Sequence, residues 1–157
     1  MEDLGLQQKV ISVDPQTGAS KAYVRGFEYK SKVEDNIKSL KALEGATLVK
    51  FIDGKGKEIT TGIISTGMEF IIEINGVQHH FIVVIMGDVN GDGMIQATDY
   101  RRIQNQIMEV SPKLVDEYAL AADIDDNKKV QATDYRAIQN HIMEVKAISQ
   151  KNKTWEI

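Results

Sequence analysis

The second half of the chain contains an internal repeat with an offset of 35 residues. The segment QATDYRRIQNQIMEV, residues 96–110, returns as QATDYRAIQNHIMEV, residues 131–145. The two copies differ only at Arg102/Ala137 and at Gln106/His141. Each copy opens in an acidic loop and then places its apolar residues at helical spacing. Two copies of one short unit predict a compact pair of helices related by an approximate twofold axis.

Each copy overlaps a 12-residue stretch with acidic or amide side chains at its first, third, fifth and twelfth positions. These stretches are DVNGDGMIQATD, residues 88–99 (loop one), and DIDDNKKVQATD, residues 123–134 (loop two). Ca²⁺ prefers six to eight oxygen ligands, and a 12-residue loop supplies them at positions 1, 3, 5, 7, 9 and 12, with a backbone carbonyl at position 7. The predicted ligands of two Ca²⁺ ions are Asp88, Asn90, Asp92, the carbonyl of Met94, Gln96 and Asp99 in loop one, and Asp123, Asp125, Asn127, the carbonyl of Lys129, Gln131 and Asp134 in loop two.

The two loops differ at position 6, which is Gly93 in loop one and Lys128 in loop two. That position takes a left-handed backbone conformation, which costs a residue with a side chain on the order of 1 kcal/mol. We therefore expect the second site to bind calcium more weakly. At position 8, Ile95 and Val130 are predicted to join the loops as a short bridge and to couple the sites. Magnesium is disfavoured, because it tends to keep its water ligands.

The first half of the chain has a β-rich pattern. KVISVD and KAYVRGFEY flank the turn-forming PQTGAS, and MEFIIEI and HHFIVVIM flank Asn75-Gly76, a strong two-residue hairpin signal. Between these pairs, TLVKFID has the pattern of another strand. VEDNIKSLKAL places four apolar residues at helical spacing, namely Val33, Ile37, Leu40 and Leu43. Residues 1–86 are predicted to form a small module that is either α+β or similar to a β-sandwich.

The pattern changes at Gly87, and no linker precedes it, so we expect a rigid junction. Residues 87–147 are predicted to form an all-α module with two calcium loops and three helices. Its middle helix is expected to begin at Ser111, with Pro112 in the first turn. Residues 148–157 form a C-terminal tail, whose Trp155 is expected to pack back on the module.

The composition excludes several classes of protein. The net charge of −4 and the pI near 5.4, without any basic run, argue against nucleic-acid binding. The absence of cysteine excludes disulfides and thiolate metal sites. No apolar run approaches the roughly 18 residues that a membrane span needs. The first residues do not form a secretion signal, so for an extracellular protein we expect Met1 to begin a trimmed chain.

The loops do not match a calcium sensor of the EF-hand type. Such a sensor has a helix before each loop and usually a glutamate at position 12, whereas loop one follows a predicted strand and both loops end in aspartate. The segments GDVNGDGMIQATDYRRIQNQIM and ADIDDNKKVQATDYRAIQNHIM instead resemble the dockerin family. Asn127 and Lys128 depart from the dockerin pattern, which bears on the affinity of the second site.

The resemblance implies a non-catalytic module that folds on two Ca²⁺ ions and binds a cohesin. It would thereby attach its parent protein to a scaffoldin or to a cell-surface anchor in a cellulosome-type assembly. It also implies a secreted protein associated with the cell surface. Residues 1–86 are similar, in position and strand content, to the X modules that directly precede some dockerins and stiffen them.

Each repeated helix has one predicted buried stripe and one exposed face, because successive side chains are about 100° apart. The stripe of the first copy consists of Tyr100, Ile103, Ile107 and Val110. The predicted partner-binding face consists of Ala97, Thr98, Arg101, Gln104, Asn105 and Met108 in the first copy, and of Ala132, Thr133, Arg136, Gln139, Asn140 and Met143 in the second. The resemblance to dockerins adds Glu109 and Glu144. A duplicated face allows two docking orientations about 180° apart; the alternative is that only one copy is used.

An enzyme is not indicated, since the chain has no nucleophile motif or phosphate loop, and His79 and His80 are expected to point to opposite faces of a strand. Any catalytic domain is expected elsewhere in the parent protein. The closer alternative is a secreted, calcium-stabilised structural module without a cohesin partner. Calcium-dependent binding would separate this alternative from a dockerin.

Overall fold

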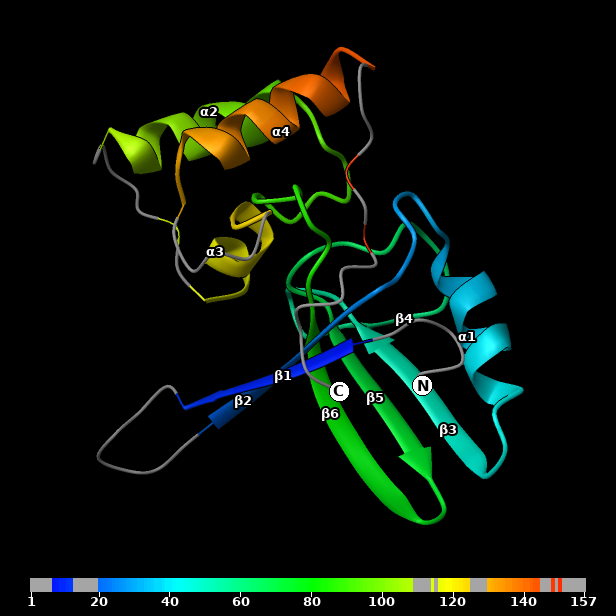
Figure 1. Cartoon of the computed structure of the whole chain (residues 1–157). Coiled ribbons are helices and arrows are strands. Elements are labelled where there is room, and N and C mark those ends of the chain that lie inside the picture. The colour runs from blue at the N-terminus through cyan, green and yellow to red at the C-terminus, as the bar shows by residue number, and fades with distance from the viewer. Residues whose placement is uncertain are drawn as a thin grey trace.

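The computed structural model describes residues 7–12, 20–108, 114, 116–124, 130–144, 148 and 150. The first half contains a six-stranded sheet with the order β1-β2-β6-β5-β3-β4 (Figure 1). Neighbouring strands are antiparallel except β2 and β6, which are parallel. The strands are β1 (Gln7–Ser12), β2 (Ser20–Arg25), β3 (Ala46–Ile52), β4 (Glu58–Ile59), β5 (Glu69–Ile74) and β6 (Val77–Val83).

Both hairpins expected from the sequence are confirmed. Strand β1 pairs with β2 across the PQTGAS segment, and β5 pairs with β6 from Glu69↔Ile82 to Ile74↔Val77. Asn75 and Gly76 connect β5 to β6 with φ values of 53° and 80°. A two-residue turn with positive φ at both positions matches the right-handed twist of the strands, which is why Asn-Gly predicts it.

Helix α1 (Val33–Lys41) packs against the sheet and shares its apolar cluster. Val33 and Leu40 are buried in that cluster, together with stacked rings of Phe51 and Phe70 whose centroids lie 5.0 Å apart. The described strands belong to one sheet, and the apolar side of α1 supplies the packing that a second sheet would otherwise supply. The module is therefore α+β, and the β-sandwich alternative is wrong.

The second half contains helices α2 (Ala97–Ile107), α3 (Asp116–Ala122) and α4 (Ala132–Ile142). Figure 1 shows α2 and α4 side by side and running in opposite directions, with α3 between this pair and the sheet. The rings of Tyr100 and Tyr135 lie 4.1 Å apart. These residues are equivalent in the two repeats, so their contact marks the approximate twofold axis. The prediction that the middle helix begins at Ser111 is wrong, because the described Leu114 is not helical and α3 begins at Asp116.

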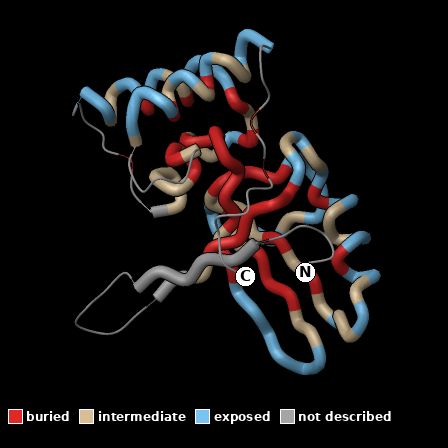
Figure 2. The backbone as a smooth tube through the Cα atoms, in the orientation of Figure 1, coloured by how far each residue is buried: buried red, intermediate tan, exposed pale blue. Residues whose placement is uncertain are grey.

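A second apolar cluster spans the junction between the two halves. It joins Tyr23, Val84 and Met86 of the sheet half to buried residues of the helical half, including Val89 and Ile103. Figure 2 shows the buried backbone continuing from the strands into the first loop. The shared cluster provides the physical basis for the rigid junction that the sequence predicts, because the two halves cannot separate without exposing it.

The C-terminal segment also contacts this junction. The Gln150 side chain accepts a hydrogen bond from the Met86 N–H at 2.7 Å and donates one to the Met86 carbonyl at 3.0 Å. Ile148 is buried in the second cluster. Trp155, which the sequence predicts to pack, lies outside the described residues. None of the helices in the described part of the chain combines the length and apolar character needed to cross a bilayer.

Candidate calcium loops and binding face

Loop one begins directly after the sheet and holds its first predicted ligand in a dense set of hydrogen bonds. Asp88 is fully buried. Its Oδ1 accepts hydrogen bonds from the N–H groups of Gly91 and Asp92 at 3.1 and 3.2 Å. Its Oδ2 accepts from the N–H groups of Gly93 and Thr66 at 2.9 and 3.0 Å. The loop therefore folds around this carboxylate, with one donor coming from the sheet half.

The last predicted ligand of loop one, Asp99, joins the loop to helix α2. It lies in the first turn of α2 and is fully buried. Its Oδ1 accepts from the N–H groups of Val89 and Asn90 at 2.9 and 3.3 Å, and its Oδ2 accepts from the Gln96 N–H at 2.8 Å. A carboxylate in the first helical turn is also favoured by the helix dipole.

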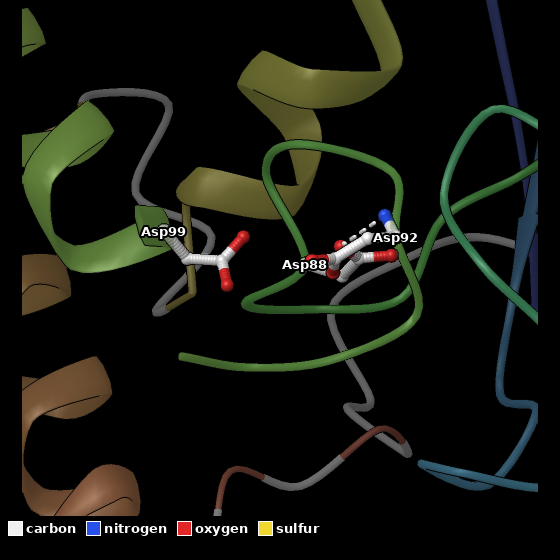
Figure 3. Close-up of side chains that lie close together, drawn as sticks. All are labelled: Asp88, Asp92 and Asp99. Carbon is white, nitrogen blue, oxygen red and sulfur yellow. Dashed lines mark hydrogen bonds between the residues drawn. The ribbon is translucent and has the colours of Figure 1, made fainter. Parts of the chain in front are cut away.

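Three predicted ligands converge on one point. The carboxylates of Asp88, Asp92 and Asp99 each offer an oxygen, and these oxygens all lie within 4.8 Å of one another. Figure 3 shows the carboxyl group of Asp99 directed toward Asp88 and Asp92. Oxygens bound to one Ca²⁺ ion at about 2.4 Å are at most about 4.8 Å apart. The spacing and the hard oxygen donors therefore fit a calcium ion.

The electrostatics of loop one also fit a cation. Burial raises the pKa of Asp88 to about 7; the charges of Asp99 and Asp92 act in the same direction, while N–H bonds from Thr66 and Gly93 oppose it. Burial is also the main reason that the pKa of Asp99 is raised. A divalent cation among these carboxylates would favour their charged forms and lower both pKa values.

The other predicted ligands of loop one lie at its edge. The Asn90 Oδ1 accepts from the Asp92 N–H at 3.3 Å, and the Asn90 side-chain amide donates to Asp92 and Thr98. Met94 donates its N–H to Asp92 Oδ1 at 2.9 Å. The Gln96 side chain is exposed. These contacts place the three residues around Asp92 and Asp99, on the loop that carries the carboxylate cluster.

Gly93 has the left-handed conformation that the sequence predicts, with φ of +81°. A Cβ atom at this position would lie 3.1 Å from Ile63 Cγ2 and 3.2 Å from the Ile64 carbonyl oxygen. The glycine is therefore required both by its backbone conformation and by the close approach of the sheet half.

The first and last predicted ligands of loop two are buried, like those of loop one. Asp134 is fully buried and Asp123 is 8% exposed. Asp134 Oδ1 accepts from the Ile124 N–H and Oδ2 accepts from the Gln131 N–H, both at 2.8 Å. These bonds are the counterparts of those made by Asp99 with Val89 and Gln96. The middle of the loop, with Asp125, Asn127, Lys128 and Lys129, lies outside the described residues.

The predicted bridge between the loops is not formed in the described part of the chain. Ile95 and Val130 pack in the same apolar cluster, but no strand-like bridge joins them. The Ile95 N–H is instead donated to the Tyr29 hydroxyl at 2.9 Å. The sequence could not reveal this contact, because Tyr29 is 66 residues away and follows strand β2.

The predicted partner-binding face is largely exposed in both copies. Met108 and Met143 are each 64% exposed. The other exposed members are Ala97, Thr98, Arg101 and Gln104 in the first copy, and Ala132, Thr133, Arg136, Gln139 and Glu144 in the second. Asn105 and Asn140 are half-buried, and Glu109 lies outside the described residues. Helices α2 and α4 thus present matching surfaces to solvent.

The predicted buried stripe is correct in part. Ile103 is fully buried and Tyr100 is half-buried, while Val110 lies outside the described residues. Ile107, however, is 39% exposed, and its equivalent Ile142 is 40% exposed. The helices pack closely at the twofold axis near Tyr100, and Ile107 lies about 10 Å further along α2. The last turn therefore extends beyond this contact and adds an isoleucine to the exposed surface beside each methionine.

Comparison with known proteins identifies one family. The model described as "Dockerin type I domain" matches residues 86–143, a segment that contains both loops and helices α2, α3 and α4. No curated protein and no solved structure matches the chain.

Proposed function

Because residues 86–143 of this chain are a dockerin domain, we propose that residues 87–147 bind a cohesin module in a calcium-dependent manner. The interaction attaches the parent protein to a scaffoldin or to a cell-surface anchor in a cellulosome-type assembly. The observation that carries this proposal is the duplicated exposed face, in which Met108 and Met143 are each 64% exposed beside polar residues of α2 and α4.

Calcium holds the duplicated face in shape. Asp88, Asp92 and Asp99 would hold one ion in loop one, with Asn90, Gln96 and the Met94 carbonyl completing the set. Asp123, Asp125, Asn127, Gln131, Asp134 and the Lys129 carbonyl would hold the second. The ions supply positive charge where buried carboxylates meet. Asp99 and Asp134 lie in the first turns of α2 and α4, so filling each loop fixes the helix that follows it.

The partner contacts an apolar centre with polar surroundings. Met108 lies beside Ile107, and both are exposed at the end of α2. Arg101, Gln104 and Asn105 supply charge and hydrogen bonds along the same helix. Methionine and arginine are enriched at protein interfaces. Two Ca²⁺ ions change the formal net charge of −4 to about zero, so packing and hydrogen bonds contribute more than long-range attraction.

The twofold relation supports two docking orientations. The same residue types recur on α4, and the Tyr100 and Tyr135 rings meet at the axis. Rotating the partner by about 180° would exchange the contacts of α2 with those of α4. Residues 1–86 act as an X-type module that stiffens the dockerin without catalysing a reaction. The whole unit works outside the cell.

Calorimetry of the chain against a panel of type I cohesins tests this function. One-to-one binding in calcium that disappears in EDTA is the expected result. If calcium folds the chain but none of the cohesins binds, the calcium loops serve structure alone and the proposed docking role is wrong.

A further inference from the structure

The sheet half contacts loop one through a main-chain amide. The segment that precedes β5 contains Thr66, which is 3% exposed. Its N–H donates a hydrogen bond of 3.0 Å to Oδ2 of Asp88, which is the first predicted calcium ligand. The two residues are 22 positions apart in the chain, and their contact is buried. One of the four donors that hold this carboxylate thus comes from outside the loop.

The Thr66 side chain holds the same region in a second way. Its Oγ1 donates to the Ile85 carbonyl at 3.2 Å and accepts from the Ile85 N–H at 3.0 Å. The Ile85 carbonyl also accepts the Asp88 N–H at 2.9 Å. Thr66 is therefore bonded to both ends of the turn that leads into loop one. This double contact fixes its amide opposite the Asp88 carboxylate.

Close packing accompanies these bonds. A Cβ atom on Gly91 would lie 2.8 Å from the Thr66 carbonyl oxygen, which is too close for any side chain. Gly93 approaches Ile63 and Ile64 in the same segment, as described above. The backbone of loop one thus lies directly against residues 63–66, and its two internal glycines permit this approach.

A second contact from the sheet half reaches loop one at Ile95. The Tyr29 hydroxyl accepts the Ile95 N–H, and the Tyr29 ring packs edge-on against the His141 ring with centroids 5.1 Å apart. Ile95 occupies position 8 of the loop, between the predicted ligands Met94 and Gln96. Tyr29 and Thr66 together support the loop near its first ligand and near its middle.

We propose that the sheet half completes the first calcium site, with Thr66 and Tyr29 as positioning residues. Thr66 holds Asp88 in place for the ion, and Tyr29 fixes the loop between the carbonyl of Met94 and Gln96. A loop that is ordered before the ion arrives loses less conformational entropy on binding. Loop one therefore binds calcium more tightly than its own 12 residues would. This inference rests on the proposed calcium binding.

The support that Thr66 and Tyr29 provide is specific to loop one. Tyr29 and Thr66 lie outside the repeat, and the Thr66 amide has a single hydrogen, which Asp88 accepts. The twofold axis relates the loops but cannot supply loop two with the same two residues. These two contacts therefore add to the sequence differences between the two loops and make the sites more unequal.

The sequence offers separate reporters for the two loops. Gly91 and Gly93 lie in loop one, and loop two contains no glycine. Lys128 and Lys129 lie in loop two, and loop one contains no lysine. Amide spectra of the full chain labelled with ¹⁵N-glycine or ¹⁵N-lysine therefore follow each site during a calcium titration.

The test compares wild type with Thr66→Val and Tyr29→Phe, which remove a hydroxyl with little change of shape. Each variant is expected to need about five- to tenfold more calcium to shift the Gly91 and Gly93 signals. The lysine signals should change by less than about twofold. Thr66→Ser should restore the wild-type midpoint, because it keeps the hydroxyl. Thr61→Val is the matched control, since Thr61 is exposed in the same segment.

Two results would overturn the proposal. Unchanged glycine midpoints in both variants would remove any positioning role, and equal weakening at both loops would indicate general destabilisation instead. If Thr66→Val does not fold, Tyr29→Phe still decides the question. Wild-type glycine signals that do not respond to calcium would overturn the calcium site itself, and the proposed function with it.

Discussion

The helices of the two repeats have almost the same sequence, whereas their calcium loops differ in sequence and in surroundings. Loop one lies against the sheet half, with Thr66 bonded to Asp88 and Tyr29 bonded to Ile95. It also has Gly93 where loop two has Lys128. The binding faces on α2 and α4, in contrast, are exposed to a similar degree, as the equal values for Met108 and Met143 indicate. The molecule thus combines two predicted binding faces of similar exposure with two predicted calcium loops that differ in sequence and in their contacts.

The largest expected effect is on cohesin binding and follows from the equivalence of the two faces. Replacing Asn105 and Met108 with alanine should weaken cohesin binding by less than about threefold, because the partner can use the other copy. Replacing Asn140 and Met143 as well should weaken it by about 1000-fold, since central interface residues each contribute roughly 2 kcal/mol. Calorimetry measures both changes. Val77→Ala is the matched control, as Val77 is an apolar residue exposed on the β5–β6 hairpin.

A strong loss from the first pair alone would show that only one face is used. The second face would then be a duplication without its own docking mode. The two repeats would differ in partner binding as well as in their calcium loops.

Removing the last carboxylate of each loop should weaken calcium at that loop. Asp99→Asn is expected to reduce the affinity of loop one by about 100-fold, because it removes a ligand charge and leaves buried N–H groups poorly satisfied. Asp134→Asn should do the same for loop two. The ¹⁵N-glycine and ¹⁵N-lysine signals separate the effects. Asp53→Asn is the control, since Asp53 accepts N–H bonds in the distant β3–β4 turn.

If Asp99→Asn weakened both loops equally, the sites would be coupled and could not be treated as separate. The shared apolar cluster around Ile95 and Val130 would then be the path of that coupling.

The buried Asp88 carboxyl predicts an unusual response to pH when calcium is absent. Its pKa is raised to about 7, above the ordinary aspartate value of 3.8 that the unfolded chain has. Between these values the folded chain binds the proton more tightly, so its free energy of unfolding should fall as pH rises, by at most about 1.4 kcal/mol per pH unit. Urea unfolding in EDTA at pH 5.5 and 7.5 measures this.

Asp88→Asn should remove most of that dependence, and saturating calcium should reverse its sign, because the ion binds the charged carboxylate. A wild-type chain in EDTA that becomes more stable between pH 5.5 and 7.5 would contradict the burial-driven shift.

The smallest expected effect comes from exchanging the residues at position 6. Lys128→Gly should tighten calcium at loop two by about fivefold, since the sequence predicts at this position a left-handed conformation that costs a residue with a side chain about 1 kcal/mol. Gly93→Lys should weaken loop one by more than that, because its Cβ would also approach Ile63 and the Ile64 carbonyl. If the two substitutions changed calcium affinity by the same factor in opposite directions, the close approach of Gly93 to the sheet half would contribute nothing to that affinity.

Local patterns predicted the parts of the fold that depend on near neighbours. The Asn75-Gly76 turn fixed the β5–β6 hairpin through its backbone conformation, and helical spacing located α1. The repeat and its ligand spacing led to loop one, whose three aspartate carboxylates converge in the structure. These features are encoded within about a dozen residues, so a single sequence reveals them.

Contacts between distant segments could not be predicted in the same way. The parallel pairing of β2 with β6 brings Tyr23 next to Ile82, and no local pattern specifies it. The bonds of Thr66 to Asp88 and of Tyr29 to Ile95 likewise join residues that are far apart in the chain. Helical periodicity assigns Ile107 to the buried stripe, because periodicity specifies which side a residue faces but not where the contact with a neighbouring helix ends.

Calcium titration calorimetry of the full chain tests most directly whether two calcium sites of unequal affinity hold the duplicated face in shape. Two calcium ions per chain with distinct affinities are expected, and Asp99→Asn should weaken the binding of the tighter of the two. A single calcium ion, or two ions of equal affinity that Asp99→Asn weakens together, would contradict two sites of unequal affinity.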